Sequence, residues 1–457
     1  MVKNKPKYHI ITFGCQGNKS DSERLAALLD GMGMAETGEA AEADLIVMNS
    51  CSVRQSAEDR VFGKLKVFRK LREANPNLVI AVTGCLPGRD RDRKIRAKMP
   101  EADLYFPIRD MVQMPKWLSG LRPDLFPQGD GLDGDYLKIE PRHAPGSQAF
   151  VTIQNGCNQY CTYCVVPYGR GPESNRPVAD IMGEIRGLAE RGVVEITLLG
   201  QVVNAFRAPD PESFSKGNPY RDHYAALLWE VNRIPGIRRL HWTAAHPRFM
   251  TDEVIDALTL PKQLNYLHLP VQSGSNEVLK RMNRKYTRDQ YLDILRKVKE
   301  KRPGIALGTD IIVGFCGETE ADFEDTLSLY READFDISYN ARYSPRSGTL
   351  SHKLFRDDVS REVKKERWER LQGLMGEIVL KKNQEYLGKT VEVLVDERGD
   401  GWCGGNSREM KRVRFACDRD LNGQVVRVEI GRALEWMLFG KMVDPDPQTP
   451  SLRETYA

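Results

Sequence analysis

The first third of the chain alternates short apolar runs with stretches of helical hydrophobic spacing. Its three candidate strands are residues 8–13, 45–48 and 78–83. After the first run, apolar residues recur at i, i+3, i+4 and i+7, which is one face of a helix. These residues are Leu25, Leu28, Leu29 and Met32. Ser20 and Glu23 form an S-x-x-E pattern, which predicts a capping box at the start of this helix. The whole pattern predicts a parallel, flavodoxin-like α/β domain in residues 1–123.

A second and longer β/α series follows residues 124–147, a stretch rich in Pro and Gly that we interpret as a linker. The candidate strands of this series are 149–153, 195–199, 238–242, 266–269, 306–312 and 337–343. Helical segments lie between these strands. Residues 148–380 are therefore predicted to form a partial (β/α) barrel of parallel strands.

The hydrophobic period changes to two near the end of the chain. A highly charged helical stretch precedes this change, and the runs 390–395 and 425–430 then alternate polar and apolar residues. Gly-rich turns separate these runs, so residues 381–444 are predicted to form a small all-β barrel. Residues 445–457 are rich in Pro and are interpreted as a tail.

Composition and charge narrow the class of protein only a little. The chain is 40% hydrophobic and 29% charged, and no run approaches the ~18 apolar residues of a membrane span. Its beginning lacks the long apolar stretch of a signal peptide, so we expect a cytoplasmic protein without a membrane partner. A net charge of +4 does not by itself indicate a nucleic-acid partner. Four basic residues near the end could contact phosphate, or could equally be a solvated face. They are Arg408, Lys411, Arg412 and Arg414.

Three of the nine cysteines follow the first barrel strand with C-x₃-C-x₂-C spacing. In a reducing compartment, cysteines favour metal or redox chemistry over disulfides. Cys157, Cys161 and Cys164 would leave one iron of a [4Fe–4S] cluster without a protein ligand, open to the amino and carboxylate groups of S-adenosylmethionine (SAM). The alternative is a zinc site, which usually needs C-x₂-C pairs and a fourth ligand. Tyr163, between the last two cysteines, could lie against the adenine of SAM.

Three further cysteines each follow one strand of the first series. Cys15, Cys51 and Cys85 lie just beyond the three apolar runs. The carboxyl ends of parallel strands meet at one edge of a sheet, so these thiols can converge on one centre. The alternative is three unrelated buried cysteines, since free Cys is often a small core residue. The placement predicts a second iron–sulfur cluster.

Taken in order, several short segments resemble the radical-SAM methylthiotransferase family over nearly the whole chain. The matching segments are 13–18, 49–54, 84–85, 156–172, 199–201, 267–275, 310–315, 317–319 and 343–346. The chain departs from the family pattern at Gly17, Val202 and Cys316. None of these departures removes a predicted cluster ligand.

The resemblance implies a function as well as three domains. The first domain would bind an auxiliary [4Fe–4S] cluster through Cys15, Cys51 and Cys85, and the barrel would bind the second cluster. The C-terminal barrel would be an RNA-binding domain of the TRAM type. The segments are most similar to the branch that inserts a methylthio group at carbon 2 of N6-dimethylallyladenosine, at position 37 of tRNA beside the anticodon. This implies SAM used twice per turnover, an anticodon stem–loop as partner, an external electron donor such as flavodoxin, and a monomer.

Polar residues just beyond the barrel strands are the candidates for contacting SAM, because active sites of such barrels lie at that end. These are Tyr163, Gln201, Asn204, Gln272, Ser273 and Asp310. The alternative for each is a structural residue that satisfies the backbone at a strand end. No catalytic side chain is predicted beyond the two clusters.

Three alternatives to this function remain open at this point. Two keep the chemistry and change the target to N6-threonylcarbamoyladenosine in tRNA or to an aspartate of a ribosomal protein. The third is a non-enzymatic iron–sulfur protein that binds RNA. The open-iron spacing of the second cysteine set argues against it, because a structural cluster would use four ligands.

Overall fold

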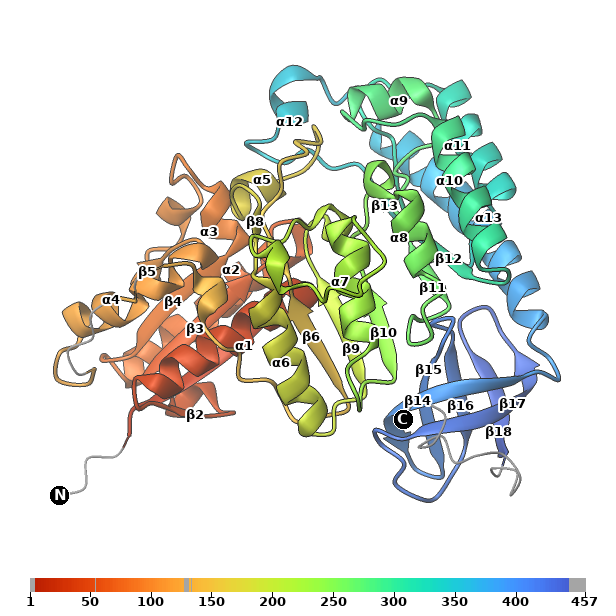
Figure 1. Cartoon of the computed structure of the whole chain (residues 1–457). Coiled ribbons are helices and arrows are strands. Elements are labelled where there is room, and N and C mark those ends of the chain that lie inside the picture. The colour runs from red at the N-terminus through yellow and green to blue at the C-terminus, as the bar shows by residue number, and fades with distance from the viewer. Residues whose placement is uncertain (1–4, 54, 127–130, 133, 444–457) are drawn as a thin grey trace.

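The computed structural model describes residues 5–443 except 54, 127–130 and 133. It contains an α/β domain, a barrel-like domain and a closed β-barrel, which follow one another along the chain (Figure 1). The predicted tail, residues 445–457, lies outside the described residues.

The N-terminal domain is built on a five-stranded parallel sheet with the strand order β2-β1-β3-β4-β5. The strands are β1 (Lys7–Phe13), β2 (Ala35–Glu36), β3 (Leu45–Ser50), β4 (Val79–Gly84) and β5 (Leu104–Tyr105). The helices are α1 (Gln16–Gly31), α2 (Gln55–Ala74), α3 (Cys85–Arg89) and α4 (Met114–Leu121). Every residue of β3 and β4 is buried, because α1 and α2 pack on opposite faces of the sheet. The predicted α/β domain is confirmed.

The start of α1 differs from the sequence prediction. The helix begins at Gln16, and the backbone N–H of Cys15 donates to Asn18 Oδ1 at 3.3 Å. The predicted capping box at Ser20 is therefore wrong, since Ser20 and Glu23 lie inside the helix. Ser20 is buried, and its hydroxyl forms a hydrogen bond of 2.9 Å with Thr152 of the barrel. The residue that looks like a cap in the sequence instead joins two domains.

The stretch between the first two domains packs against both of them. Phe126, Tyr136 and Leu137 are buried in the core of the N-terminal domain. Further along, His143 Nε2 lies 3.0 Å from Glu184 of the barrel, and its Nδ1 lies 3.2 Å from Glu23 of α1. This segment therefore contributes side chains to the domain core and to the interface.

The central domain contains six parallel strands in two three-stranded sheets. Its strands are β6 (Gln148–Thr152), β9 (Glu195–Leu199), β10 (Arg239–Trp242), β11 (Tyr266–His268), β12 (Ala306–Val313) and β13 (Ile337–Arg342). A parallel bridge between Leu240 and Gln263 links the two sheets, which gives the predicted partial barrel. A small hairpin of β7 (Gln154–Asn155) and β8 (Ser174–Asn175) flanks the first cysteine-bearing loop of the barrel.

Helices cover the outside of this barrel and share one large hydrophobic core with its strands (Figure 1). They are α6 (Val178–Glu190), α7 (His223–Asn232), α8 (Asp252–Ala257), α9 (Asn276–Arg281), α10 (Arg288–Lys301), α11 (Glu320–Ala333) and α13 (Arg361–Gln384). Two short helices, α5 (Val166–Gly169) and α12 (Leu350–Leu354), contribute no residue to this core. The predicted charged stretch is α13, which packs against β13 and leads into the last domain.

The C-terminal domain is a closed five-stranded barrel with the order β14-β15-β16-β18-β17. Its strands are β14 (Thr390–Gly399), β15 (Trp402–Ser407), β16 (Arg412–Ala416), β17 (Val425–Ala433) and β18 (Leu438–Val443). The predicted all-β domain is confirmed, and its alternating pattern reflects side chains that point in turn to the barrel core and to solvent. No helix in the described part of the chain is long and apolar enough to cross a membrane.

Candidate active site

The first cysteine group lies in the loop between β7 and α5, beyond the end of β6. Cys157 and Cys161 are buried and Cys164 is half-buried. Each sulfur accepts an N–H bond of 3.4 Å: Cys157 from the backbone of Gln159, Cys164 from that of Val166, and Cys161 from the guanidinium of Arg284. Hydrogen bonds to sulfur stabilise thiolate ligands of iron–sulfur clusters. We call Cys157, Cys161 and Cys164 the barrel triad.

Arg284 supplies the only side-chain donor to the barrel triad among the described contacts. Its other nitrogens donate to the carbonyl of Pro270 at 3.1 Å and to Tyr286 Oη at 2.9 Å, and the residue is buried. The loops after the cysteines and after β11 are thereby joined around one positive charge. The sequence alone did not identify Arg284, because the residues around it resemble those around an ordinary exposed arginine.

The second group, which we call the N-domain triad, consists of Cys15, Cys51 and Cys85. Each follows a strand, at one edge of the sheet: β1, β3 and β4 respectively. The thiol of Cys85 interacts electrostatically with those of Cys51 and Cys15, so it lies near both of them. The backbone N–H of Val53 donates to Cys51 Sγ at 3.3 Å.

Burial sets the protonation of these thiols. It raises the pKa of Cys85 and of Cys164 to about 12 and that of Cys157 to about 11. As thiols they hold their protons at neutral pH, so metal binding must release those protons. In the part of the chain that the structure describes, no group of three His, Cys, Asp or Glu side chains could share one metal ion. Each triad supplies three thiolates and would leave one iron of a cubane cluster without a protein ligand, so the donor sets fit two such clusters.

The two triads are brought together by close packing of α3 against α5. A β-carbon at Gly88 would overlap the carbonyl oxygen of Gly169, and one at Gly169 would lie 3.0 Å from the carbonyl oxygen of Cys85. Only glycine allows this approach, since any side chain would separate the two backbones. The loop of the barrel triad consequently touches the residue that carries the third thiol of the N-domain triad.

A buried ion pair crosses the same interface. Arg170 follows α5, and its Nη2 donates to Asp21 Oδ2 of α1 at 2.7 Å, while its Nη1 donates to Asn155 Oδ1 at 3.0 Å. Both members of the pair are almost fully buried. Arg170 also interacts electrostatically with Cys85, which lowers the pKa of that thiol against the effect of burial. Arg170 therefore joins the end of α5 to α1 and places its positive charge beside the N-domain triad.

The Arg170→Gln substitution is expected to loosen this interface. Breaking a buried pair from one side leaves Asp21 as an uncompensated charge, which costs about 3–5 kcal/mol of unfolding free energy. Urea unfolding of the purified chain would measure this loss. Arg142→Gln is the matched control, because Arg142 also pairs with two carboxylates but is 42% exposed, and its loss should cost under about 1 kcal/mol. Equal losses for the two variants would contradict a structural role for the Arg170–Asp21 pair.

A second set of polar contacts holds the Cys51 loop against the barrel. Arg346, after β13, donates to Gln55 Oε1 at 2.6 Å and to the carbonyl of Val53 at 3.1 Å. Arg89 forms two bonds of 2.8 and 2.9 Å to the carboxylate of Glu58 and one of 2.7 Å to Ser347 Oγ. The loop that carries Cys51 is thus fixed from the barrel side.

The side chains predicted to contact SAM differ in their hydrogen bonding. Some are already hydrogen-bonded to backbone groups, and others have polar atoms without a partner among the described residues. The amide of Asn204 donates to the carbonyl of His246 at 3.0 Å and accepts from its N–H at 2.8 Å, so it ties two strand-end loops together. Gln201, beyond β9, has a buried Oε1 without a hydrogen-bond partner among the described residues. The ring of Tyr163 packs edge-on against Phe315 with centroids 6.5 Å apart.

The remaining three predicted contacts lie on β12 and the loop after β11. Gln272 is buried with φ +75°, and its backbone bridges to Asp310 and Ile312 of β12. Ser273 is buried, and its hydroxyl lies 3.3 Å from Thr326 Oγ1. Asp310 Oδ1 lies 3.2 Å from His268 Nε2. Of these three, Asp310 lines a cavity at the mouth of the barrel, whereas the hydroxyl of Ser273 faces α11.

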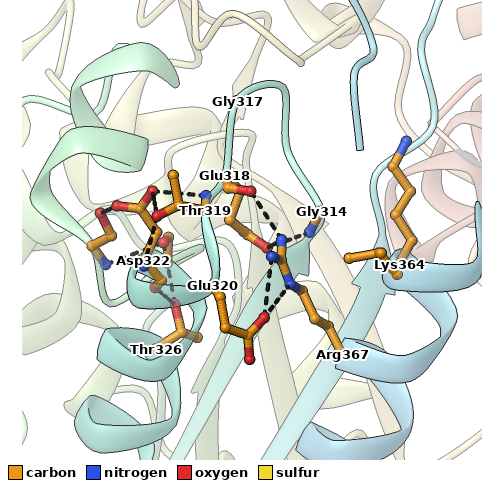
Figure 2. Close-up of polar contacts among 12 residues, drawn as sticks. Gly314, Gly317, Glu318, Thr319, Glu320, Asp322, Thr326, Lys364 and Arg367 are labelled. Atoms are coloured by element: carbon orange, nitrogen blue, oxygen red, sulfur yellow. Dashed lines mark hydrogen bonds and ion pairs between the residues drawn. The ribbon is translucent and has the colours of Figure 1, made fainter. Parts of the chain in front are cut away.

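The loop between β12 and α11, which supports Tyr163 through Phe315, is held by a buried carboxylate (Figure 2). Glu318 accepts from the backbone N–H of Gly314 at 2.8 Å and from Arg367 of α13 at 2.9 Å. Burial raises the pKa of Glu318 to about 7, against the lowering effect of these bonds. A β-carbon at Gly314, which has φ +70°, would overlap Lys364, so the tight turn depends on glycine.

Most of the predicted RNA-binding residues have partners inside the chain. Arg408 donates to the carbonyls of Pro261 and Gln263 at 2.7 Å, and Lys411 pairs with Asp336 at 3.0 Å. These contacts fasten the β-barrel to the central domain, a role that the local charge pattern did not indicate. Two residues stay on the surface of the barrel: Arg412 pairs with Asp396 and Glu397, and Arg414 stacks on Trp402 at 3.7 Å.

Comparisons with known proteins match this architecture. Residues 151–330 match the Radical SAM superfamily, and residues 7–107 match the Uncharacterized protein family UPF0004. The chain is 41% identical to the tRNA-2-methylthio-N(6)-dimethylallyladenosine synthase of Moorella thermoacetica, over 97% of this chain and 100% of that protein. It is 41% identical to the enzyme of the same name from Bacillus subtilis, over 96% of this chain and 86% of that protein.

Solved structures show the same fold at low sequence identity. The radical S-adenosylmethionine methyltransferase TsrM from Kitasatospora setae, solved with cobalamin and a [4Fe–4S] cluster, superposes with a TM-score of 0.54 at 11% identity, over 88% of this chain and 77% of that one. The cobalamin-dependent radical enzyme OxsB, solved with aqua-cobalamin and S-adenosylmethionine, superposes with a TM-score of 0.52 at 14% identity, over 83% of this chain and 56% of that one.

Proposed function

This chain belongs to the family of tRNA-2-methylthio-N6-dimethylallyladenosine synthases within the Radical SAM superfamily, and on that premise we propose that it inserts a methylthio group at carbon 2 of N6-dimethylallyladenosine. The target base is adenosine-37, next to the anticodon of tRNA. The observation that supports this best is the close packing of α3, which begins at Cys85, against α5, which follows Cys164. A single-cluster radical enzyme would have no need of the second triad.

The family uses SAM and [4Fe–4S] clusters, and the two triads are the ligand sets we assign to them. Cys157, Cys161 and Cys164 would hold the cluster that binds SAM, and Cys15, Cys51 and Cys85 would hold the auxiliary cluster. When bound, the SAM-binding cluster would supply the electron that cleaves SAM to a radical, which removes a hydrogen atom from the base. The auxiliary cluster would supply the sulfur that replaces this hydrogen. Homolysis suits this position, because an aromatic C–H between ring nitrogens is not acidic enough for a base.

The side chains around the triads orient and shield the reactants. The N–H donors on each barrel-triad sulfur and the buried Arg284 favour thiolate ligands over thiols. Arg170 and the close contact of Gly88 with Gly169 would hold the two domains in a fixed relative position. A base bound between the domains would then lie near both clusters. Among the predicted SAM contacts, Tyr163, Gln201, Gln272, Ser273 and Asp310 keep this role in our proposal. Asn204 would act one step further away, by positioning the loop of His246.

The surroundings of the enzyme follow from the same chemistry. A tRNA anticodon stem–loop is the substrate, and the electron that cleaves SAM would come from an external donor such as flavodoxin. We propose a cytoplasmic monomer in which residues 1–123, 148–380 and 381–444 act as the auxiliary-cluster, radical-SAM and TRAM domains. The names of the relatives favour dimethylallyladenosine over threonylcarbamoyladenosine and over a protein aspartate.

Mass spectrometry of tRNA tests this proposal directly. In a host that makes dimethylallyladenosine but lacks its methylthio derivative, expression of the chain is expected to produce methylthio-dimethylallyladenosine in digested tRNA. The Cys157→Ala variant, expressed to the same level, is expected to produce none. Absence of the new nucleoside with the unaltered chain, in cells that contain the precursor, would reject the substrate assignment.

A further inference from the structure

Two cysteines that belong to neither triad lie together in the C-terminal barrel. Cys403 is in β15, and Cys417 follows the last residue of β16. These strands are antiparallel neighbours, and Cys403 is opposite Phe415 in their register. The backbone N–H of Cys417 donates to the carbonyl of Gly401 at 3.1 Å, so the pairing of the two chains continues past the end of β16. Cys417 is two residues beyond the partner of Cys403, which places both side chains on the same face of the sheet.

The two thiols contact each other and share one hydrogen-bond acceptor. Each sulfur donates to the carbonyl oxygen of Arg419 at 3.5 Å. The thiols of Cys403 and Cys417 are also hydrogen-bonded to one another, and both side chains pack in the hydrophobic core of the barrel. Two sulfurs in hydrogen-bond contact need only a small movement to reach the geometry of a disulfide. Cys417 can make this movement more easily than a residue inside a strand, because it lies at the start of the loop after β16.

The two thiols differ in their access to solvent. Cys403 is fully buried, whereas Cys417 is half-buried. Burial and the hydrogen bond with Cys417 raise the pKa of Cys403, so this sulfur is mostly protonated at neutral pH. A reagent in solution therefore reaches Cys417 first, and Cys403 is placed to attack the sulfur of Cys417 afterwards. An accessible thiol beside a second thiol that can resolve its oxidised form is the arrangement of a reversible redox site.

We propose that Cys403 and Cys417 form a reversible disulfide by exchange with a small-molecule disulfide such as oxidised glutathione. The thiolate of Cys417 attacks one sulfur of the reagent, the S–S bond of the reagent breaks, and one thiolate leaves. The thiolate of Cys403 then attacks the sulfur of Cys417 in the mixed disulfide and releases the second thiolate. The protein loses two electrons and the two thiol protons, and the reagent gains both and becomes two thiols.

The disulfide would make the stability of the C-terminal barrel depend on the redox state of its surroundings. Disulfides in reducing compartments are usually transient and redox-sensing. This one would close the segment 403–417 into a loop and so restrict the unfolded state of the barrel. The core of this barrel is much smaller than that of the central domain, and a cross-link has a large relative effect on a domain with a small core. Oxidation is therefore expected to stabilise this barrel without involving either triad.

Peptide mapping of the cluster-loaded full chain tests the proposal. The chain is incubated anaerobically at rising ratios of oxidised to reduced glutathione, the remaining thiols are blocked, and the protein is digested with trypsin. The two cysteines fall in different tryptic peptides, 399–408 and 415–419. These peptides are expected to appear as one linked species, with the mass of both less two hydrogen atoms, and to separate on addition of dithiothreitol. A mixed disulfide at Cys417 without the linked species, or unlinked peptides at the highest ratio, would overturn the proposal.

Two controls show whether the linkage is specific to this pair. Cys417→Ser keeps the size of the side chain and should give no linked species at any ratio. Cys316 is the matched thiol, because it is buried and also lies outside both triads, but in the central domain. The peptide that contains Cys316 should stay unlinked throughout. Links between Cys316 and either barrel cysteine would show unspecific oxidation of unfolded protein and would contradict the proposal.

Hydrogen exchange of the full chain measures what the disulfide does to the barrel. Amides of β15 and β16 are expected to exchange up to about 100-fold more slowly in the oxidised chain, the effect of closing a loop of about 15 residues. Cys417→Ser should show no such change in the same buffers. Unchanged exchange in a fully linked chain would contradict the stabilising role. Neither measurement depends on methylthio transfer, so this inference stands or fails separately from the proposed function.

Discussion

Replacement of Cys161 by alanine is expected to abolish production of 5′-deoxyadenosine from SAM. Cys161 is buried, and the guanidinium of Arg284 donates to its sulfur at 3.4 Å. Alanine would remove one of the three thiolates that we assign to the SAM-binding cluster. Substitution of outer-shell residues around metals costs about 10- to 100-fold in affinity or activity, and loss of a ligand from a set of three should exceed that. Anaerobic assay with a strong reductant and chromatography of the products would measure it.

The matched control for this prediction is Cys417→Ala. Cys417 belongs to the C-terminal barrel and lies outside both triads. That variant should cleave SAM at the rate of the unaltered chain and contain the same amount of iron. Residual 5′-deoxyadenosine from Cys161→Ala at a comparable rate would refute the assignment of the barrel triad.

The strands and the two cysteine triads could be predicted from sequence because both depend on local order along the chain. Each buried parallel strand is a continuous apolar run, and each N-domain thiol follows such a run, so the sheet topology alone brings them to one edge. The predicted ranges of the six central-barrel strands agree with the structure to within one residue at either end. The predicted cap of α1 failed for the opposite reason: Ser20 has the local pattern of a cap, but its hydrogen-bond partner Thr152 is 132 residues away.

Charged residues could be located from the sequence but their partners could not. Arg408 and Lys411 look like half of a phosphate-binding run, yet their partners are carbonyls and a carboxylate of the central domain. Arg170 stands inside a recognisable motif, but only the folded chain reveals Asp21 opposite it. The same holds for Asn204, whose amide is matched by the backbone of His246. Pairing across domains depends on the whole fold, and the local hydrophobic periodicity of the sequence does not reveal it.

Replacement of Cys51 by alanine is expected to separate two activities that the unaltered enzyme couples. SAM cleavage should continue, because the barrel triad and Arg284 belong to the central domain and are untouched. Methylthio transfer should fall below detection, because the auxiliary cluster would lose one of its three ligands. The iron content should fall by about half, since each of the two clusters holds four irons.

The fold should tolerate the Cys51→Ala change, so the loss can be attributed to the cluster. Arg346 holds this loop by hydrogen bonds to the carbonyl of Val53 and to the side chain of Gln55. Neither hydrogen bond involves the sulfur of Cys51. Both products are measured in one reaction by mass spectrometry, with Cys161→Ala as the variant that should lose both. Methylthio transfer by Cys51→Ala would show that the sulfur donor is not held by the N-domain triad. Loss of SAM cleavage together with transfer would show that the two triads form one interdependent centre, because contact through Gly88 and Gly169 would then carry a defect from one to the other.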